Sequence, residues 1–375
     1  MDDLAALVEL TLIPGIGSLA QARLTGACAD SSRICELAPR ELEFLEVPAE
    51  ASEALRAGRY RPMAEEIVDW CMREGCRLLV RGRPGYPKLL EEIYDPPLVL
   101  YARGHVEVLD MPCVAIVGTR RPTPYGLQMA EGLGYDLGAR GIVVVSGLAR
   151  GIDGAAHRGC LDGGGRTAAV LGSGIDVIYP QEHRRMSRDI ENHGVLLSEF
   201  APGTSPAPQN FPVRNRIISG LSLGTLVVEA GEYSGSLITA RLAMEQNREV
   251  YALPGNLTSP QSFGPNFLIK QGAKLVQSWR DIVEEFPPEL RCRLLQNEEV
   301  GQADRPQLEL LDEDESAVLA ALDTDRAILF DRLLRSTGIE ISRLSNLLLN
   351  LEMRGYVRML PGGLYIRVAR PPQKK

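Results

Sequence analysis

The chain has 375 residues, of which 45% are hydrophobic and 24% are charged, a composition that fits an ordinary globular protein with two or three domains. Its formal net charge of −8 argues at first against a nucleic-acid partner. The charge is unevenly distributed, however: −6 over residues 1–102, +1 over 103–283, −10 over 284–325 and +7 over 326–375. The acidity therefore lies at the front and in one linker, and the last segment is basic.

The N-terminus has no features of a targeting segment. Asp2 and Asp3 stand where a signal peptide needs basic residues, and no apolar run approaches the ~18 residues of a membrane span. The seven cysteines form no C-x-x-C pair and have no nearby histidines. We therefore expect a cytoplasmic protein with reduced, mostly structural thiols, without membrane contact and without a metal or other cofactor.

The first segment, residues 1–75, is predicted to be a helical domain of the helix-hairpin-helix (SAM-like) type. Apolar-periodic residues from 4 to 24 are interrupted by the turn Pro14-Gly15-Ile16-Gly17. Such a turn leaves backbone N–H groups that can hold a DNA phosphate without reading bases. Because the segment is acidic and lacks basic residues beside the turn, packing or protein binding is the favoured interpretation, with DNA binding as the alternative.

From residue 76 to residue 290 the pattern predicts an α/β domain with a doubly wound, mostly parallel sheet. Short apolar runs alternate with helical segments, and each run ends in small or polar residues. The expected strands are residues 76–80, 114–117, 142–145, 167–171, 195–198, 225–228 and 249–253. Because ligands bind at the carboxyl edge of such sheets, we expect a cleft along these strand ends.

Four loops at this edge share a chemistry suited to phosphate. They are Gly118-Thr119-Arg120, 146–151, 172–174 and 234–239, and all offer hydroxyls and backbone N–H groups. The chain has neither a G-x-G-x-x-G followed by an acidic residue ~20 positions on nor a G-x-x-x-x-G-K-[ST]. Ordinary NAD binding and P-loop nucleotide hydrolysis are therefore poorly supported.

The segment Phe211-Pro-Val-Arg214-Asn215-Arg216 is the most unusual. A helix that starts after Pro212 would separate Arg214 and Arg216 by about 200°, so that one faces a ligand and the other faces the fold. An exposed aromatic ring beside arginine and asparagine suits a splayed-out base. Alternatively, Phe211 belongs to the core and one of the two arginines pairs with a buried glutamate.

The sequence gives little support to catalysis. Asp153 and His157 share a helical face, but the same pattern fits an acidic residue at a helix start beside a hydrogen-bonded histidine. No Ser-His-Asp set, metal cluster or paired carboxylates are apparent, and Cys160 has no identifiable base. We therefore expect a binding protein and not an enzyme.

The last part of the chain is predicted to be an acidic linker over residues 291–315 followed by a winged helix over residues 316–375. Its recognition helix would carry Arg343, Asn346, Asn350 and Arg354. The charge of +7 slightly favours DNA binding, although winged helices also dock proteins.

Taken together, these motifs closely resemble the DNA-processing protein A (DprA/Smf) family. The resemblance runs in order from about Tyr86 to Ile282, and its longest motifs are residues 146–157, 211–222 and 227–240. It implies a Rossmann-like domain and a protein that binds single-stranded DNA during natural transformation. It further implies protection of incoming strands, assistance in loading the recombinase RecA, and a homodimer formed through the Rossmann-like domain.

The resemblance also implies roles for individual residues. Arg120 and its turn, Gly118 and Thr119, would hold a DNA phosphate, aided by Ser146 and Gly147. Phe211 would stack on a base with Asn215 and Arg216 beside it, and Lys274 would be an outer phosphate contact. The chain departs from the family pattern before Phe211, where Pro208 and Gln209 stand in place of a basic residue.

A second hypothesis is an enzyme that acts on nucleotides. The segment Gly224-Thr225-Leu-Val-Val-Glu229 is similar to the Gly-Thr-x-x-Glu signature of nucleoside-monophosphate phosphoribohydrolases, which have a related fold. Their preceding Pro-Gly-Gly is replaced here by Leu221-Ser-Leu, which weakens this hypothesis.

Overall fold

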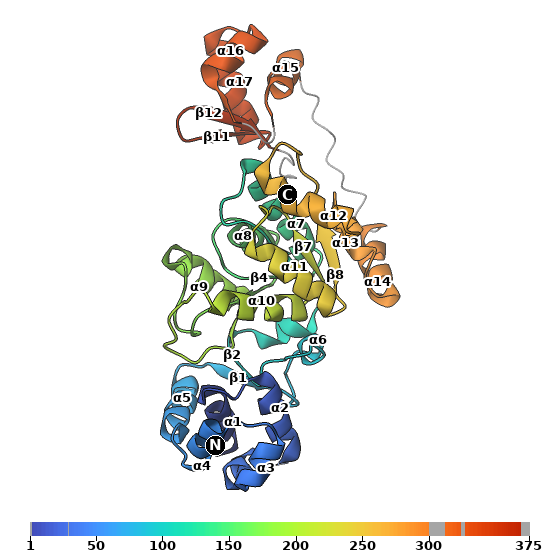
Figure 1. Cartoon of the computed structure of the whole chain (residues 1–375). Coiled ribbons are helices and arrows are strands. Elements are labelled where there is room, and N and C mark those ends of the chain that lie inside the picture. The colour runs from blue at the N-terminus through green and yellow to red at the C-terminus, as the bar shows by residue number, and fades with distance from the viewer. Residues whose placement is uncertain (1, 29, 300–311, 324–326, 369–375) are drawn as a thin grey trace.

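The computed structural model describes residues 2–28, 30–299, 312–323 and 327–368. Figure 1 shows the N-terminal helices beside one end of a central sheet domain and a small C-terminal domain beyond the opposite end. No helix among these residues has the length and apolar character needed to span a bilayer.

The N-terminal helices are α1 (Asp2–Leu12), α2 (Ser18–Ala27), the 3-10 helix η1 (Ser31–Glu36), α3 (Pro39–Phe44), α4 (Ala49–Arg56) and α5 (Arg61–Arg73). The predicted hairpin between α1 and α2 is present, and Gly15 turns the chain there with a positive φ of 88°. Their apolar side chains share one continuous core with Tyr101, Leu148 and Leu171 of the sheet domain. The first 75 residues are therefore packed onto the sheet.

The central sheet has nine strands in the order β1-β2-β6-β5-β4-β3-β7-β8-β9. They are β1 (Arg77–Val80), β2 (Val99–Gly104), β3 (Cys113–Val117), β4 (Val143–Ser146), β5 (Thr167–Val170), β6 (Val195–Ser198), β7 (Gly224–Val227), β8 (Glu249–Ala252) and β9 (Lys274–Leu275). The seven strands from β3 to β9 run parallel, and β2 pairs in antiparallel fashion with both of its neighbours, β1 and β6. The doubly wound fold class predicted from the sequence is confirmed.

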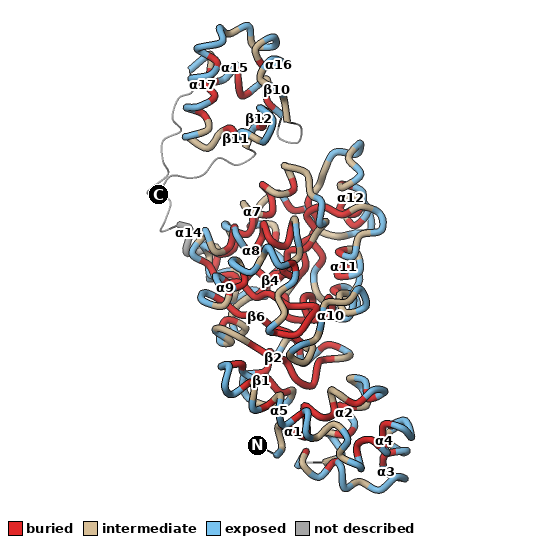
Figure 2. Tube along the Cα trace, turned by 90° about the vertical axis from the view of Figure 1, so that its left-hand side faces the viewer, coloured by how far each residue is buried: buried red, intermediate tan, exposed pale blue. Residues whose placement is uncertain are grey.

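Helices cover both faces of this sheet, which leaves its strands buried (Figure 2). One face carries α7 (Pro124–Gly138), α8 (Ile152–Asp162), α9 (Arg184–His193), α13 (Trp279–Val283) and α14 (Pro288–Glu299). The other carries α6 (Lys88–Glu91), α10 (Asn210–Gly220), α11 (Gly235–Glu245) and α12 (Phe263–Lys270). Short 3-10 helices lie at Val106–Asp110, Gln181–His183 and Pro260–Ser262.

The strand order reverses at β3, whose neighbours are β4 and β7. The chain leaves β3 toward β4 on one side, whereas it leaves β7 toward β8 on the other. A crevice opens at such a switch point in doubly wound sheets because the two connections diverge. The loop that follows β3 therefore lies where a ligand is expected.

The C-terminal domain consists of α15 (Glu313–Ala321), β10 (Ile328–Leu329), α16 (Phe330–Thr337), α17 (Ile341–Met353), β11 (Val357–Leu360) and β12 (Leu364–Arg367). This is the predicted winged helix, with the hairpin β11–β12 as its wing. The structure differs within the predicted linker 291–315. Residues 288–299 form α14, and the acidic residues from 312 cap and begin α15, while residues 300–311 lie outside the described ranges.

Candidate functional site

A shallow cleft lies at the carboxyl ends of β3, β4 and β5. It has a volume of about 40 Å³ and combines three arginines with two aromatic rings. Its lining residues are Arg120, Gly147, Ala149, Arg150, Tyr179, Pro180, Phe211 and Arg214. Cations beside exposed rings are what a nucleic-acid strand requires, because the cations hold phosphates and the rings stack on bases.

The Phe211 ring lies at the centre of this cleft. The Arg120 guanidinium lies over the ring, 5.0 Å from its centroid, and the Tyr179 ring is tilted by 39° at a centroid distance of 5.9 Å. A Cβ atom at Gly172 would come within 2.8 Å of the ring, so the glycine makes room for it. Phe211 is half-buried. It packs against the loop 172–174, which contains Gly172 and is predicted from the sequence to suit phosphate.

Arg214 fixes the floor of the cleft beneath Phe211. Its side chain is buried, and its guanidinium donates hydrogen bonds to the carbonyl oxygens of Gly147, at 2.7 Å, and of Val170. The Asp153 carboxylate, also buried, supplies the opposing charge. Burial lowers the pKa of Arg214 to about 10, so that the group stays charged at neutral pH. One arginine thus ties the ends of β4 and β5 together.

The turn after β3 differs from the expectation that its backbone amides are free. The Thr119 N–H donates to the Glu229 carbonyl at 2.7 Å, and the Thr119 hydroxyl accepts a bond from the Arg121 N–H at 3.2 Å. A side chain on Gly118 would collide with Ile152 and the Glu229 carbonyl. Gly118 and Thr119 therefore shape the turn, and the exposed Arg120 side chain is the group that this turn presents to solvent.

Ser146 and Gly147 likewise serve the fold. The Ser146 hydroxyl is fully buried and donates to the Ile116 carbonyl at 2.6 Å. Gly147 donates its N–H to Asp153 at 3.1 Å, and a Cβ there would lie 2.4 Å from the Arg214 guanidinium. The Ser146 side chain cannot reach a phosphate in this arrangement, whereas Gly147 reaches the cleft through its backbone.

The structure separates Arg216 from the cleft. Arg214 and Arg216 point in different directions, as predicted, although the helix begins at Asn210, two residues before Pro212. The Arg216 guanidinium forms ion pairs with Asp95 at 3.0 Å and Glu199 at 2.6 Å and is buried. Arg216 therefore faces the fold, and Arg214 faces the cleft.

Asn215 is also buried, and its side chain contacts Arg214 and the Gly235 carbonyl.

Lys274 lies on β9, three strands from β3 and thus about 14 Å away across the sheet. Its ammonium group is paired with Glu284 at 2.8 Å and Glu285 at 2.7 Å. Neither Asn215 nor Lys274 joins the cluster around Phe211.

Two further residues line the cleft: Tyr179, which the sequence did not indicate, and Arg150, which the sequence indicated only as part of the loop 146–151. Tyr179 is 43% exposed, and Arg150 is exposed and forms a bidentate ion pair with Glu182, with both contacts at 2.6 Å. Both stand in loops after strands that had been located, but no periodic pattern marks them. Only their position at the same sheet edge as Phe211 and Arg120 could have pointed to them.

The residues considered for acid–base chemistry lie inside the fold. His157 is fully buried beside Thr167, and burial lowers its pKa to about 3, so the imidazole stays neutral. The Asp153 carboxylate accepts bonds from the N–H groups of Gly147 and Ala149. Burial raises the pKa of Cys160 to about 12. These groups stabilise the interior and face no ligand.

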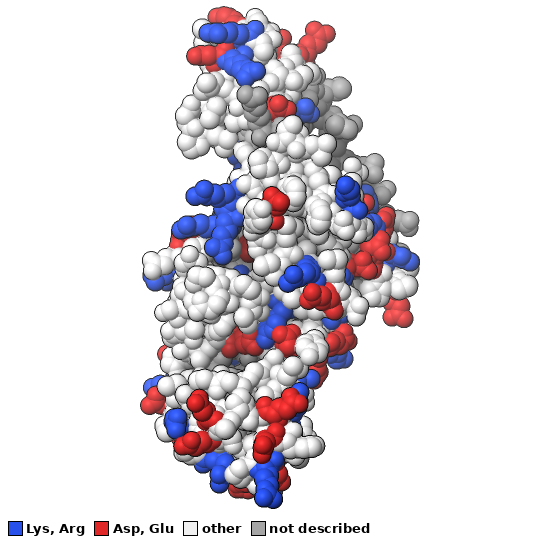
Figure 3. Space-filling view, in the orientation of Figure 1, with Lys and Arg blue, Asp and Glu red and all other residues white. Residues whose placement is uncertain are grey.

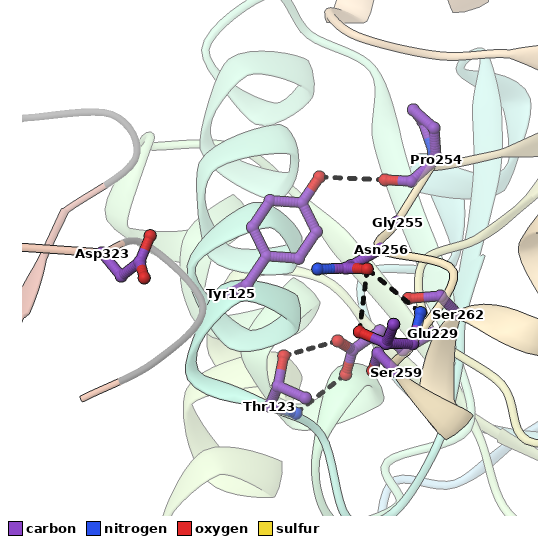
Figure 4. Close-up of a pocket in the computed structure, with 10 residues that line it drawn as sticks. Thr123, Tyr125, Glu229, Pro254, Gly255, Asn256, Ser259, Ser262 and Asp323 are labelled. Atoms are coloured by element: carbon purple, nitrogen blue, oxygen red, sulfur yellow. Dashed lines mark hydrogen bonds between the residues drawn. The ribbon is translucent and has the colours of Figure 1, made fainter.

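A larger cavity of about 520 Å³ lies on the other side of the β3 turn (Figure 4). Hydroxyl, amide and carboxyl groups line it, and none of its lining residues within the described ranges is a lysine or an arginine. Both oxygens of its Glu229 carboxylate accept hydrogen bonds from Thr123, at 2.8 and 2.5 Å. Despite its greater volume, this cavity suits a polyanion less well than the arginine-rich cleft, because it offers no positive charge.

Lysine and arginine side chains gather along the edge of the sheet domain on which α8 and α9 lie (Figure 3). In the winged helix, by contrast, Arg343 pairs with Asp314, and Arg354 pairs with Glu315 at 2.6 Å. The outward face of α17 exposes Leu349 and Met353. Its two predicted recognition arginines are therefore engaged within the domain.

The remaining chemistry is simple. All seven cysteines have free thiols. Within the described ranges no three His, Cys, Asp or Glu side chains gather as metal ligands would.

Comparison with known proteins identifies two matching family models. The model described as DNA recombination-mediator protein A matches residues 77–287, and the model of the DprA winged helix domain matches residues 302–363. The chain is 44% identical over 230 residues to a DNA processing protein, DprA, of Bacillus subtilis, which covers 61% of this chain and 77% of the relative.

Two solved structures are also similar. The DNA processing protein A of Streptococcus pneumoniae superposes with a TM-score of 0.68 at 34% identity, over 76% of this chain and 98% of that one. The Helicobacter pylori protein, whose structure concerns its mode of single-stranded DNA binding, superposes with a TM-score of 0.52 at 32% identity, over 59% and 96%.

Proposed function

This chain belongs to the DNA recombination-mediator protein A (DprA/Smf) family, and from that premise we propose that it binds single-stranded DNA through the cleft around Phe211. The observation that carries the proposal is the placement of Arg120 and Arg214 against the half-buried Phe211 ring. An aromatic ring can stack on any base, and a guanidinium can donate hydrogen bonds to any phosphate. The site therefore binds a strand without reading its sequence.

Single strands fit this cleft better than duplexes do. A base can reach Phe211 only if it is unpaired and turned out of the stack, which costs a duplex several kcal/mol by order of magnitude. The similar Helicobacter pylori protein, studied for its single-stranded DNA binding, supports the same preference. The ligand is therefore a single strand, held by its backbone and one or more bases.

We expect single-stranded oligonucleotides to bind more tightly than duplexes of equal length, and Arg120→Ala to weaken that binding. Loss of one phosphate contact should also lower the slope of log K against log salt by about 0.7. Fluorescence anisotropy at several salt concentrations measures both effects. Arg40→Ala, an exposed arginine of the N-terminal helices, is the control and should match the native protein. Equal affinity of native protein and Arg120→Ala for every strand contradicts the proposal.

The enzyme hypothesis predicts a different result in the same preparation. Three residues and not two separate Thr225 from Glu229, and the Glu229 oxygens are occupied by Thr123. Turnover of a nucleoside monophosphate without binding of any strand favours the enzyme. We propose that the protein has no such activity.

We further propose that the protein acts in the cytoplasm on strands taken up during natural transformation, shields them and promotes their loading with RecA. The support is family membership, together with a strand-binding cleft that leaves most of the strand accessible. RecA filament formation on a single strand coated with single-strand binding protein measures this step. The native protein should accelerate it, and Arg120→Ala should do so less.

The assembly is proposed to be a homodimer formed through the Rossmann-like domain. Phe263 and Phe267 of α12 are 46% and 48% exposed and stack in parallel at 6.2 Å, and Leu257 nearby in sequence is 90% exposed. Exposed aromatic residues are enriched in protein interfaces. A dimer would double the contacts to one strand, which compensates for the missing basic residue before Phe211.

We expect Phe267→Glu to convert the dimer to a monomer, because a charge would be buried at the interface without a partner. The control is Phe44→Glu, which places the same charge on an 88% exposed ring of α3 and should leave the dimer intact. Size-exclusion chromatography with light scattering at micromolar concentration measures the mass. A native protein that stays monomeric, or an unchanged Phe267→Glu dimer, contradicts this interface.

A further inference from the structure

Helix α9 carries three arginines on one exposed face. Arg184, Arg185 and Arg188 fall within about 100° of one another around the helix axis, opposite the buried Ser187 and Ile190. None of the three side chains makes a hydrogen bond or ion pair with a residue that the structure describes. This arginine row of α9 is a concentrated positive charge without a partner.

The arrangement is unfavourable for the helix that carries it. The N-terminal end of a helix is positive, and α9 has two arginines in its first turn, no acidic residue there and no side-chain cap from His183. Arg188 repels Arg184 at i,i+4 and Arg185 at i,i+3. Helix α15 shows the favourable pattern, with three acidic residues in its first turn and an aspartate cap. Asp189, at i,i+4 from Arg185, and Glu191, at i,i+3 from Arg188, offset part of this repulsion, but neither relieves the two arginines of the first turn, so an anionic ligand is the explanation that we favour.

The row is adjacent to the cleft and continuous with it. Only the 3-10 helix Gln181–His183 lies between Pro180 of the cleft and α9, and His183 Nδ1 lies 2.9 Å from the Leu148 carbonyl in the loop after β4. Glu182 holds Arg150 of the same loop. Arg184 lies four positions after Pro180, so their Cα atoms are at most about 14 Å apart. At about 3.4 Å per nucleotide, about four nucleotides of a strand bridge this gap.

We propose that the arginine row of α9 is a second, outer binding site for the backbone phosphates of the single strand that enters the cleft around Phe211. This inference rests on the proposed function and extends it. The cleft holds the first bases, and the row holds the phosphates that follow. The flanking acidic residues Asp189 and Glu191 form no ion pair with the row in the described structure, so its charge is available to the strand.

The test uses the full chain and two lengths of oligothymidylate, about 3 and about 20 nucleotides, so that only the longer strand reaches α9. The variant is the triple change Arg184→Gln, Arg185→Gln and Arg188→Gln. It is expected to bind the short strand as the native protein does and the long strand about tenfold more weakly. Its salt slope for the long strand should be smaller by about 2, because three contacts each contribute about 0.7.

A matched control removes the same charge elsewhere. Arg40, Arg56 and Arg59 are exposed residues of the N-terminal domain that form no ion pair with a residue that the structure describes, and their triple change to glutamine should leave both strands bound as before. The α9 variant should unfold close to the native temperature, since the two like-charge repulsions that are removed are offset by the lost attractions of Arg185 to Asp189 and of Arg188 to Glu191. A lower melting temperature with weak binding of both strands would assign the row a structural role and overturn the proposal.

The outcomes separate this inference from the proposed function. If the native protein binds neither strand, the cleft proposal fails. If the short strand binds and the α9 variant retains native affinity and salt slope for the long strand, only the outer site fails. If that variant binds both strands as the native protein does but promotes RecA loading less, the row contacts a protein. This outcome also overturns the proposal.

Discussion

Replacing Arg214 with alanine is expected to lower the free energy of unfolding by about 3–5 kcal/mol, the typical cost of breaking a buried charge pair from one side. The guanidinium is buried, donates to the carbonyl oxygens of Gly147 and Val170 and balances the charge of Asp153. Without it, the Asp153 carboxylate keeps neutral partners alone, the Gly147 and Ala149 amides and the Ser146 side chain. Burial already raises the pKa of Asp153, and that carboxylate would then lose its counter-ion.

Urea denaturation of Arg214→Ala and of the native protein measures this cost. Arg214→Lys should retain the charge but lose the forked geometry, so its loss should be smaller, and it provides a folded variant if the alanine variant does not fold. The control is Arg33→Ala, whose side chain is exposed and pairs only with Glu36. An Arg214→Ala protein with the native denaturation midpoint would show that this arginine does not hold the cleft together.

Replacing Phe211 with alanine is expected to weaken single-strand binding by about 1–3 kcal/mol, or about 5- to 150-fold, because one stacked base is lost. The ring is half-buried at the surface of the cleft, so the fold and its melting temperature should change little. Native affinity in Phe211→Ala would place the ring in the core and not in the binding site.

The pairing of Arg120 with Phe211 makes a sharper experiment possible. In the unbound protein the Arg120 guanidinium covers the ring, and such a contact is worth about 0.5–1 kcal/mol at an exposed site. If a base stacks on that face of the ring, the contact between Arg120 and Phe211 must break first. Each single variant lacks this contact and therefore does not incur the free-energy cost of breaking it. The losses of Arg120→Ala and Phe211→Ala should then sum to about 0.5–1 kcal/mol less than the loss of the double variant.

A double-mutant cycle by anisotropy measures that difference, and its sign is informative. Additive losses would mean that binding leaves the contact between Arg120 and the Phe211 ring unchanged, and that the base stacks on another part of the ring. Single losses that sum to more than the double loss would mean that the contact strengthens on binding. Tyr179→Phe is a suitable control, because it removes a hydroxyl and retains the neighbouring ring.

The sheet, the winged helix and the position of the cleft could all be predicted from the sequence. Runs such as 113–117 are buried on both faces and read clearly as strands, and parallel strands necessarily bring their carboxyl ends to one edge. Helical periodicity also showed that Arg214 and Arg216 diverge. These features depend on local patterns, which a sequence displays directly.

Which of Arg214 and Arg216 faces the cleft could not be predicted, because the answer depends on partners that are remote in the sequence. Arg216 turns away from the cleft to meet Asp95, which lies 121 positions earlier beside two prolines that suggested only an extended connection. The Thr119 amide is likewise occupied by the loop after β7. Hydrogen bonds and ion pairs between remote segments leave no periodic trace, so the exact set of groups that face the ligand required the structure.

The shared core beneath the cleft links it to the N-terminal helices. Leu148, which follows Gly147, and Leu171, which precedes Gly172, belong to the same continuous cluster as the apolar residues of α1–α5. If strand binding shifts the loops that carry Leu148 and Leu171, a partner whose affinity depends on how these helices pack against the sheet is coupled to the strand in the cleft. Thermodynamic reciprocity requires each of the two ligands to change the affinity of the other by the same factor. In this way the packing of helices that are remote from Phe211 in the sequence would depend on whether a strand occupies the cleft.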